Sequence, residues 1–378
     1  MSPGDGPPTR ISGCSAYEFQ LSCRTVFGRG CLDSLGGQVR ALGAGMPGVL
    51  MLVLCRNSAW CAEARERIGA SLAGAGYGKK TRVRVYDRVV PNPTLGSVRE
   101  GVALCRRWGA EGIVNLGGGS VLDAGKAIAA EAGVRLLVNV PTTAGSGSEA
   151  SPWTVITDVP ARRKVSMRGR TPDLALLDPE LTMSMPDWLT LFTGVDAFSH
   201  ALEGYLSCRA CPVTDALAQA AVHLIGESLP GTLDRPGDLR ARAGMLQASF
   251  LAGAAMMHSG LGLVHAIANT LGGYYPQLVH GRVVAQLLGP VARFNRKAGE
   301  GRFGRIAGAL REMLEVCERE SARLGLGRLS ILESDIPVLV ERSAGNINAR
   351  TNPREFTGDD IRGILGDSFL VVPGREEG

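Results

Sequence analysis

The sequence has little of what marks several large function classes. Aromatic residues make up only 5% of its 378 residues, and it has no long basic run, although the net charge is +5. Nucleic-acid-binding proteins usually combine a basic stripe with stacking aromatic side chains, so this class has little support. No stretch approaches the 18 uninterrupted apolar residues of a membrane span, and residues 1–8 lack a signal-peptide pattern. We therefore expect a cytoplasmic protein that binds neither nucleic acid nor membrane.

Cysteine is not arranged as a disulfide framework would require. The nine cysteines are an odd number, scattered through a chain too long to need such a framework, so reduced thiols are expected. Cys208 and Cys211 form a CxxC, which without a second pair we interpret as a loop. The 45% hydrophobic and 20% charged residues are ordinary for a globular protein, and the length suits about two domains.

The hydrophobic pattern divides the chain into two halves. Before residue 185, apolar runs alternate with helical stretches, which is the pattern of a parallel doubly wound sheet. Beyond Pro186 strand signals fade and amphipathic stretches recur. We predict an α/β domain over 1–185 and an all-helical domain over 186–378. The expected strands lie within 17–27 and at 49–55, 81–86, 112–116 and 136–140, and the expected helices at 32–42, 59–73, 95–108, 121–132, 189–206, 213–228, 240–257, 262–274, 283–295, 302–318, 336–342 and 359–367.

Two loops rich in glycine and hydroxyl residues follow predicted strands. The first is Gly117-Gly-Gly-Ser120, and the second is 141–149, with the sequence Pro-Thr-Thr-Ala-Gly-Ser-Gly-Ser-Glu. Glycines let backbone N–H groups approach a pyrophosphate, whose charge is favoured at a helix N-terminus. Either loop alone would be taken as a flexible turn. Together, at the carboxyl ends of strands in an open α/β sheet, they predict a dinucleotide site.

Four residues of the second half form a candidate metal site. Asp196 and His200 are four residues apart, so on a helix both side chains leave one face. His265 from a later helix and His280 from the loop after it would complete the set. Any one of these histidines alone is more often packed or on the surface, but three of the chain's five histidines fall here. One carboxylate and three imidazoles suit Fe(II) or Zn(II).

Together these motifs resemble the iron-containing, or group III, alcohol dehydrogenases, relatives of glycerol dehydrogenase and dehydroquinate synthase. The resemblance covers nearly the whole chain and includes Pro91-Asn-Pro-Thr94, Asp178-Pro-Glu-Leu181 and Asn352-Pro-Arg354. It implies a dinucleotide-binding α/β domain, a helical metal-binding domain and, as is common in the family, a homodimer. The residues that match the family's metal ligands are Asp196, His200, His265 and His280, and those that match its cofactor contacts are Gly118, Gly119, Ser120, Asp123, Thr142, Thr143, Ser148, Lys164 and Leu181.

The resemblance also implies an activity, the interconversion of a small aldehyde and its primary alcohol with NAD(P)H. Fe(II) is the family's usual metal, and the same ligands accept Zn(II). The metal would polarise the substrate carbonyl, the nicotinamide would deliver hydride, and a nearby group or water would supply a proton. Two alternatives stay open. One is a dehydroquinate-synthase-like lyase, which keeps its nicotinamide bound, and the other is a non-catalytic member of the family.

Several positions depart from the family pattern. Asn269 stands where many relatives have a histidine assigned to proton relay, and an amide cannot be an acid near neutral pH. His258 is a candidate replacement for that relay. The interval from His265 to His280 is one residue longer than expected. Arg282, two residues after His280, replaces an apolar residue, and its guanidinium could clamp an anionic aldehyde, for which phosphonoacetaldehyde is the best candidate in the family.

The end of the strand at 49–55 bears on the choice of cofactor. Relatives usually carry an aspartate there that binds the adenosine ribose and so favours NAD, whereas this chain has Cys55-Arg56-Asn57. Without the carboxylate nothing repels a 2′-phosphate, and Arg56 could pair with it. We therefore expect NADPH to be preferred over NADH.

Overall fold

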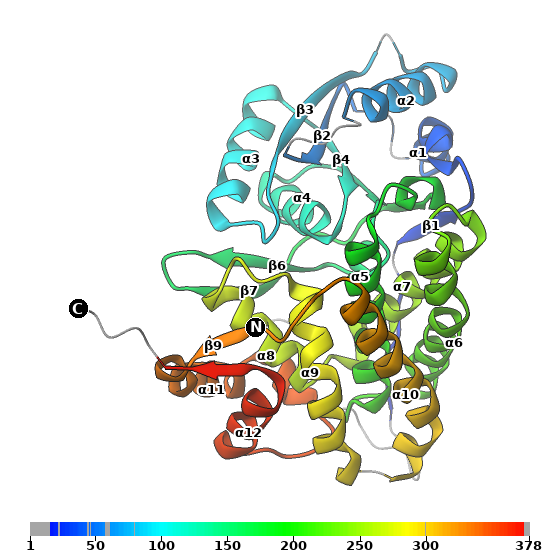
Figure 1. The fold of residues 1–378 in the computed structure, drawn as a ribbon. Coiled ribbons are helices and arrows are strands. Elements are labelled where there is room, and N and C mark those ends of the chain that lie inside the picture. Colours follow the sequence, from blue (N-terminus) through cyan, green and yellow to red (C-terminus); the bar gives the residue numbers. More distant parts are fainter. Residues whose placement is uncertain are drawn as a thin grey trace.

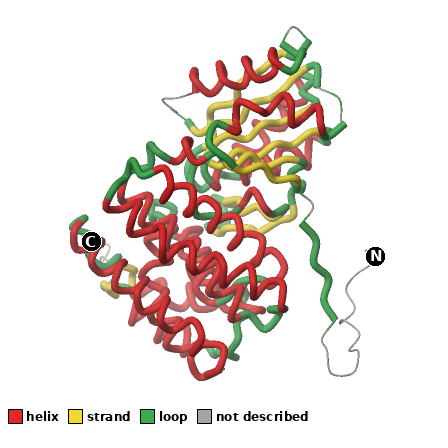
Figure 2. The backbone as a smooth tube through the Cα atoms, turned by 90° about the vertical axis from the view of Figure 1, so that its right-hand side faces the viewer, coloured by secondary structure: helices red, strands yellow, loops and turns green. Residues whose placement is uncertain are grey.

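The protein consists of an open sheet with helices on both faces and a cluster of helices below it (Figures 1 and 2). The computed structural model describes residues 16–21, 23–43, 45, 47–56, 61–78, 80–298 and 300–373. The sheet comes from the first half of the chain and the helical cluster from the second, as predicted. The boundary at residue 185 stays a prediction.

Within the described ranges the sheet has six parallel strands, in the order β1-β8-β5-β4-β2-β3. Leu50, Leu52 and Leu54 of β2 pack into one core with the first two helices, while Met51 and Val53 join the core of the next two. Both faces are therefore covered, which confirms the doubly wound prediction. The strands are β1 (Arg24–Phe27), β2 (Val49–Cys55), β3 (Arg82–Val89), β4 (Gly112–Gly117), β5 (Leu136–Pro141) and β8 (Leu174–Leu177), and the helices are α1 (Leu35–Ala41), α2 (Cys61–Gly74), α3 (Leu95–Trp108) and α4 (Gly119–Ala132).

An antiparallel hairpin follows β5, and the sequence analysis did not predict it. Its strands are β6 (Trp153–Asp158) and β7 (Arg163–Arg168). The hairpin packs on α4 from one side and on the helical cluster from the other, so it lies between the two halves (Figure 1). β7 is rich in charged side chains and only half-buried. It therefore lacks the continuous apolar run on which the other strand predictions rest.

The described part of the second half is helical, as predicted, apart from two short strands. β9 (Ser330–Leu332) and β10 (Leu370–Val372) form a parallel ladder that the all-helical prediction did not include. α6 also continues through Pro230, past its expected end at residue 228. The helices are α5 (Asp187–Leu206), α6 (Pro212–Asp234), α7 (Leu239–Ser259), α8 (Leu263–Tyr274), α9 (His280–Asn295), α10 (Glu300–Arg323), α11 (Ile336–Ala344) and α12 (Gly358–Ser368).

Helix α5 lies at the centre of this cluster. Nearly every residue from Thr190 to Leu206 is buried, and α5 packs against α6, α7 and α9. Polar side chains on such a helix have no access to bulk water, so each needs a partner or a function. In the described residues no single helix is long and apolar enough to cross a bilayer, and α7 and α8 reach that length and composition only as a pair across a 99° bend.

The cysteines whose side chains the structure describes are unpaired, as expected. All seven in the described part are free thiols. Cys211 lies at the start of α6, where its backbone N–H donates to Thr214 Oγ1 and its sulfur accepts from the same hydroxyl. The CxxC therefore includes a helix cap, which agrees with its interpretation as a loop.

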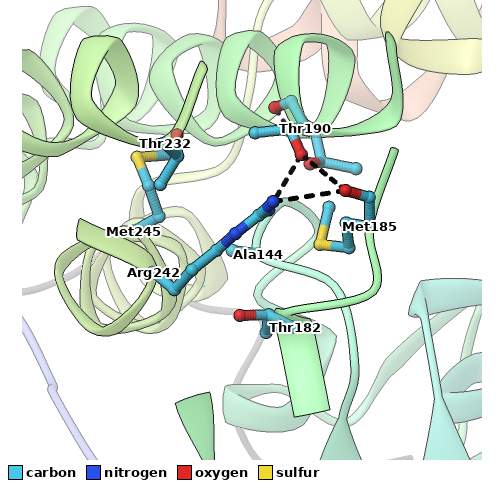
Figure 3. Close-up of a pocket in the computed structure, with 8 residues that line it drawn as sticks. Ala144, Thr182, Met185, Thr190, Thr232, Arg242 and Met245 are labelled. Carbon is cyan, nitrogen blue, oxygen red and sulfur yellow. Dashed lines mark hydrogen bonds between the residues drawn. The ribbon is translucent and has the colours of Figure 1, made fainter. Parts of the chain in front are cut away.

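A buried arginine fixes the segment through which the chain enters α5. Arg242 of α7 is only 2% exposed, and it donates from Nη1 to Thr190 Oγ1 (2.8 Å) and from Nη2 to the Met185 carbonyl (3.2 Å) (Figure 3). The guanidinium borders a cavity of about 10 Å³, which has room for one water molecule. Among the described residues it forms no ion pair, and burial lowers its pKa. Arg242 therefore donates to uncharged oxygen atoms, and these hydrogen bonds fix the start of α5.

Candidate metal centre and cofactor loops

Four predicted ligands from three helices converge on one point. Asp196 and His200 lie one turn apart on α5, and His265 lies in the first turn of α8. His280 is the first residue of α9, not part of a loop as expected. The Nε2 atoms of His265, His280 and His200 are 3.3, 3.6 and 3.9 Å from Asp196 Oδ1. The extra residue between His265 and His280 therefore does not keep His280 away from the cluster.

The Nδ1 atoms of two of these histidines are bound on the side away from Asp196. His200 Nδ1 is 3.2 Å from the Gly145 carbonyl, and His265 Nδ1 is 2.7 Å from Glu203 Oε2. A hydrogen on each Nδ1 leaves the Nε2 lone pair aimed at Asp196. His280 Nδ1 is buried and has no partner among the described residues. The rings of His200 and His265 are stacked with their centroids 4.3 Å apart, which fixes both.

The charges of the cluster also suit a cation. Burial would raise the pKa of the Asp196 carboxyl, but His200 and the hydrogen bond with His265 hold it well below its usual value. Burial lowers the pKa of His200 to about 4 and that of His280 to about 3. Burial would also lower the pKa of His265, yet hydrogen bonds to Asp196 and Glu203 raise it to about 9. The carboxylate of Asp196 thus stays ionised among the imidazoles, as metal binding requires.

The donor set fits the metal that the resemblance implies. Ligand atoms of Asp196, His265 and His280 all lie within 4.8 Å of one another. His200 lies just outside that group, with its Nε2 directed at the same carboxylate. One carboxylate oxygen and three imidazole nitrogens match Fe(II) or Zn(II) and differ from the oxygen shells of calcium or magnesium.

The two glycine-rich loops meet at one edge of the sheet. β4 and β5 are paired neighbours, with Gly117 opposite Pro141. The two loops that follow these strands therefore start side by side, at Gly118 and Thr142. A Cβ on Gly118 would lie 3.1 Å from the Thr143 side chain, so the first loop passes against the second. α4 begins at Gly119 and turns its free N–H groups toward this edge. Such an edge is where α/β sheets bind nucleotide phosphates.

Two predicted cofactor contacts are occupied by internal hydrogen bonds. Ser148 Oγ is 2.5 Å from Asp123 Oδ1, and Asp123 Oδ2 accepts from the Val155 N–H (2.9 Å). The centre of this network is Lys126, which is fully buried and donates to Ser148 Oγ (2.6 Å) and to the carbonyls of Ser148, Ser151 and Trp153. Asp123 and Ser148 therefore fasten the second loop to α4.

The other predicted site residues lie at different distances from this cluster. Asn269 is buried on α8, one turn after His265 and on the same side. His258 lies in the last turn of α7, where its Nε2 is 3.1 Å from the Gln20 carbonyl and its ring packs on Phe19. Arg282 donates from Nη2 to the Gly327 carbonyl (2.9 Å). The structure thus brings Asn269 to the cluster and gives His258 and Arg282 partners elsewhere.

Two further cofactor predictions fall on the sheet side of the molecule. Leu181 lies in a 3₁₀ turn (Pro179–Thr182) after β8 and packs against the core under α1 and α2. Arg56 follows β2 directly, is exposed, and lies at the same edge as Gly117 because β2 pairs with β4. Both positions agree with a cofactor that extends along this edge.

Lys164 of β7 reaches toward the metal cluster. Its side chain packs over Gly272 of α8, and its charge acts on both Asp196 and Asp123. Among the described residues it has no hydrogen bond or ion pair. Burial lowers the pKa of its ammonium to about 8, so the charge is present at pH 7 and lost as the pH rises. The ammonium is therefore available to an anionic group.

We expect the KM of the dinucleotide to rise between pH 7 and pH 9. Deprotonation of Lys164 in this range removes a positive charge that attracts the cofactor's phosphates. In Lys164→Met the KM should be high at all pH values and nearly flat. Lys297→Met, at an exposed lysine, is the matched control and should keep the wild-type profile. An unchanged profile in Lys164→Met would contradict this role.

Comparisons with known proteins agree with this geometry. The family model described as iron-containing alcohol dehydrogenase matches residues 22–179, and the C-terminal model of the Fe-containing alcohol dehydrogenase family matches residues 190–369. Together they cover most of the chain.

Similar proteins carry alcohol dehydrogenase names. The NAD-dependent methanol dehydrogenase of Bacillus methanolicus is 32% identical over 92% of this chain and 98% of its own length. The 1,3-propanediol dehydrogenase of Klebsiella pneumoniae is 36% identical over 76% and 83%. The crystal structure of a 1,3-propanediol oxidoreductase superposes with a TM-score of 0.83 at 30% identity, over 94% of this chain and all of that one. The chain belongs to the iron-containing alcohol dehydrogenase family.

Proposed function

We propose that the protein reduces a small aldehyde to its primary alcohol, and catalyses the reverse reaction, with a nicotinamide cofactor. The observation that carries the proposal is the position of Asp196 and the three imidazoles, which lie beside Lys164 and the two glycine-rich loops. An α/β-sheet edge suited to a dinucleotide thus adjoins a site suited to a divalent metal. Relatives named as methanol, 1-propanol and 1,3-propanediol dehydrogenases support small alcohols as the substrate class.

Separate groups of residues would bind the metal, bind the cofactor and orient the substrate. Asp196, His200, His265 and His280 would hold the metal, which as a Lewis acid favours hydride addition to the substrate carbonyl. Gly118 to Ser120 and Thr142 to Thr143 would hold the pyrophosphate end of the cofactor. Asn269 would orient the substrate or a water by hydrogen bonds, because its amide does not titrate. The proton would then come from a water beside the metal site.

The deciding experiment is anaerobic oxidation of NADPH or NADH by Fe(II)-loaded protein with propanal. Net turnover of the nicotinamide would support the dehydrogenase and oppose a lyase, in which the nicotinamide is regenerated within each cycle. Tight metal binding without turnover of any small aldehyde would support a non-catalytic family member. Zn(II)-loaded protein in the same assay separates the two metals.

We propose that NADPH is the preferred cofactor, on the strength of Arg56. In Arg56→Ser we expect kcat/KM for NADPH to fall about tenfold or more, because a charge-assisted pair with the 2′-phosphate would be lost. kcat/KM for NADH should stay unchanged. Arg82→Ser, at an exposed arginine at the opposite end of the sheet, is the control. A wild-type preference for NADH would refute the proposal and agree with the NAD-dependent relatives.

An anionic aldehyde is the second candidate substrate. Arg282, two residues after His280, motivates it, and a sulfoacetaldehyde reductase from Bifidobacterium kashiwanohense superposes with a TM-score of 0.80 at 26% identity, over 93% of this chain and 98% of that one. Phosphonoacetaldehyde and sulfoacetaldehyde should be compared with propanal under identical conditions. In Arg282→Ala, selective loss of the anionic substrates would assign the clamp to Arg282. An unchanged ratio would leave Arg282 as a residue that holds Gly327.

A further inference from the structure

We propose that Glu203 is the positioning residue of the metal centre. This carboxylate lies seven residues after Asp196 and three after His200 on α5. Residues i, i+4 and i+7 share one face of a helix, so one face of α5 carries two proposed ligands and Glu203. Glu203 does not point its oxygens at the centre of the cluster. Its Oε2 is 2.7 Å from His265 Nδ1, on the far side of that ring.

Glu203 also caps the helix that carries His265. Its Oε1 accepts from the Val264 N–H (2.7 Å), and its Oε2 accepts from the His265 N–H (3.3 Å). These are free N–H groups of the first turn of α8, where negative charge is favoured. One carboxylate thus fixes both the backbone and the imidazole of His265. Glu203 is 5% exposed, and these three donors satisfy it without a lysine or arginine partner among the described residues.

The loop before α8 is shaped to admit this carboxylate. A Cβ on Gly262 would lie 2.7 Å from Glu203 Oε1 and 2.9 Å from Asn352 Oδ1. Asn352 Oδ1 accepts from the Leu263 N–H (3.2 Å), so it caps the same helix one residue earlier. Asn352 belongs to the Asn-Pro-Arg motif, which had no assigned role. The two side chains share the task of capping α8, but only Glu203 contacts the imidazole.

The contact with the imidazole distinguishes the positioning role of Glu203 from the structural role of Asn352. A carboxylate that accepts from Nδ1–H sets the tautomer of His265 and raises the basicity of its Nε2, which strengthens metal binding. Glutamine has one acceptor oxygen, so it would turn an NH₂ group toward either the imidazole or the backbone N–H groups. Loss of Asn352 should instead cost stability and leave the tautomer of His265 intact. The inference rests on the proposed metal site.

The test compares Glu203→Gln and Asn352→Ala in the full-length enzyme, with Glu227→Gln as a control. On the surface of α6, Glu227 Oε1 lies 3.4 Å from His223 Nε2. This pair is also a glutamate and a histidine, but unlike Glu203 and His265 both side chains are exposed. We measure Co(II) and Zn(II) affinity by chelator competition, the visible absorption bands of bound Co(II), and thermal unfolding without metal. Glu203→Gln should weaken metal binding about 10- to 100-fold and change the Co(II) bands. Asn352→Ala should lower the unfolding temperature with nearly wild-type affinity, and Glu227→Gln should change nothing.

Two results would overturn the inference. One is wild-type metal affinity and Co(II) bands in Glu203→Gln, and the other is an equal loss of affinity in Asn352→Ala. If Glu203→Gln does not fold, Glu203→Asp is used, because it keeps the charge and withdraws the oxygens from His265, and the same outcomes apply. Failure of the wild-type protein to bind either metal would instead count against the proposed function.

Discussion

Replacing Asp196 by asparagine should lower kcat/KM for aldehyde reduction by about a thousandfold or more. The change is nearly isosteric, so the packing of α5 is kept while the negative charge among three imidazoles is lost. Lewis-acid catalysis is worth several kcal/mol, and each 1.4 kcal/mol is about a factor of ten in rate. The metal content of the purified protein should fall together with the activity, because neutral ligands alone bind a divalent cation less tightly.

Asp187→Asn is the control for this substitution. Asp187 lies on the same helix and pairs with Arg323 at 3.0 Å, with 34% of its side chain exposed. Exposed pairs contribute at most about 1 kcal/mol, so stability and activity should both stay close to those of the wild type. Full metal content and activity in Asp196→Asn would mean that the metal, if present, binds elsewhere.

Replacing Gly125 by alanine should lower the free energy of unfolding by about 2–4 kcal/mol. Gly125 lies in the middle of α4, and a Cβ there would be 1.7 Å from Asn115 Oδ1. Asn115 is buried in β4 and donates to Asn139 Oδ1 of β5 (2.8 Å), so its amide cannot turn aside without loss of that bond. Either the helix moves away from the sheet, or the buried amide pair breaks. Urea unfolding followed by circular dichroism measures the effect.

Gly226→Ala is the matched control for Gly125→Ala. Gly226 is exposed in the interior of α6, and a Cβ there would have no neighbour within 4 Å. Alanine has the higher helix propensity, so this variant should gain up to about 1 kcal/mol. Adding Asn115→Ala to Gly125→Ala should recover part of the lost stability, because the clash is removed. Wild-type stability in Gly125→Ala would show that α4 can shift at little cost.

The sequence pattern was sufficient for most of the buried helices and strands of the fold, but it missed the short buried strand β8. The run 49–55 became β2, and the stretch 95–108 became α3 with the same bounds. The hairpin β6–β7 and the ladder β9–β10 were missed because their side chains are half exposed or their length is three residues. Such strands owe their position to the surfaces on which they pack, which periodicity does not encode.

The site, too, could be predicted from the sequence only in part. The ligand spacing and the loop motifs were visible in the sequence, but the partners behind them were not. Glu203 could have been found from its i+7 relation to Asp196, yet nothing in the sequence links it to His265, which is 62 residues away. Arg282 and His258 were chosen because they depart from the family pattern near the ligands in sequence. The structure adds that they have hydrogen-bond partners at Gly327 and Gln20, which the sequence did not indicate. Contacts between distant segments decide such assignments.

The order of the strands has a consequence for how the chain folds. Of the described strands β1 is synthesised first, yet its neighbour in the sheet is β8, with Arg24 opposite Leu174. During translation β1 stays unpaired until β8 has been synthesised, whereas β2 to β5 can already pair with one another. Parallel pairing over so long a loop is slow, and an unpaired strand is open to wrong partners in the meantime. Closure of β1 on β8 is therefore expected to be a late step in folding, after the centre of the sheet has formed.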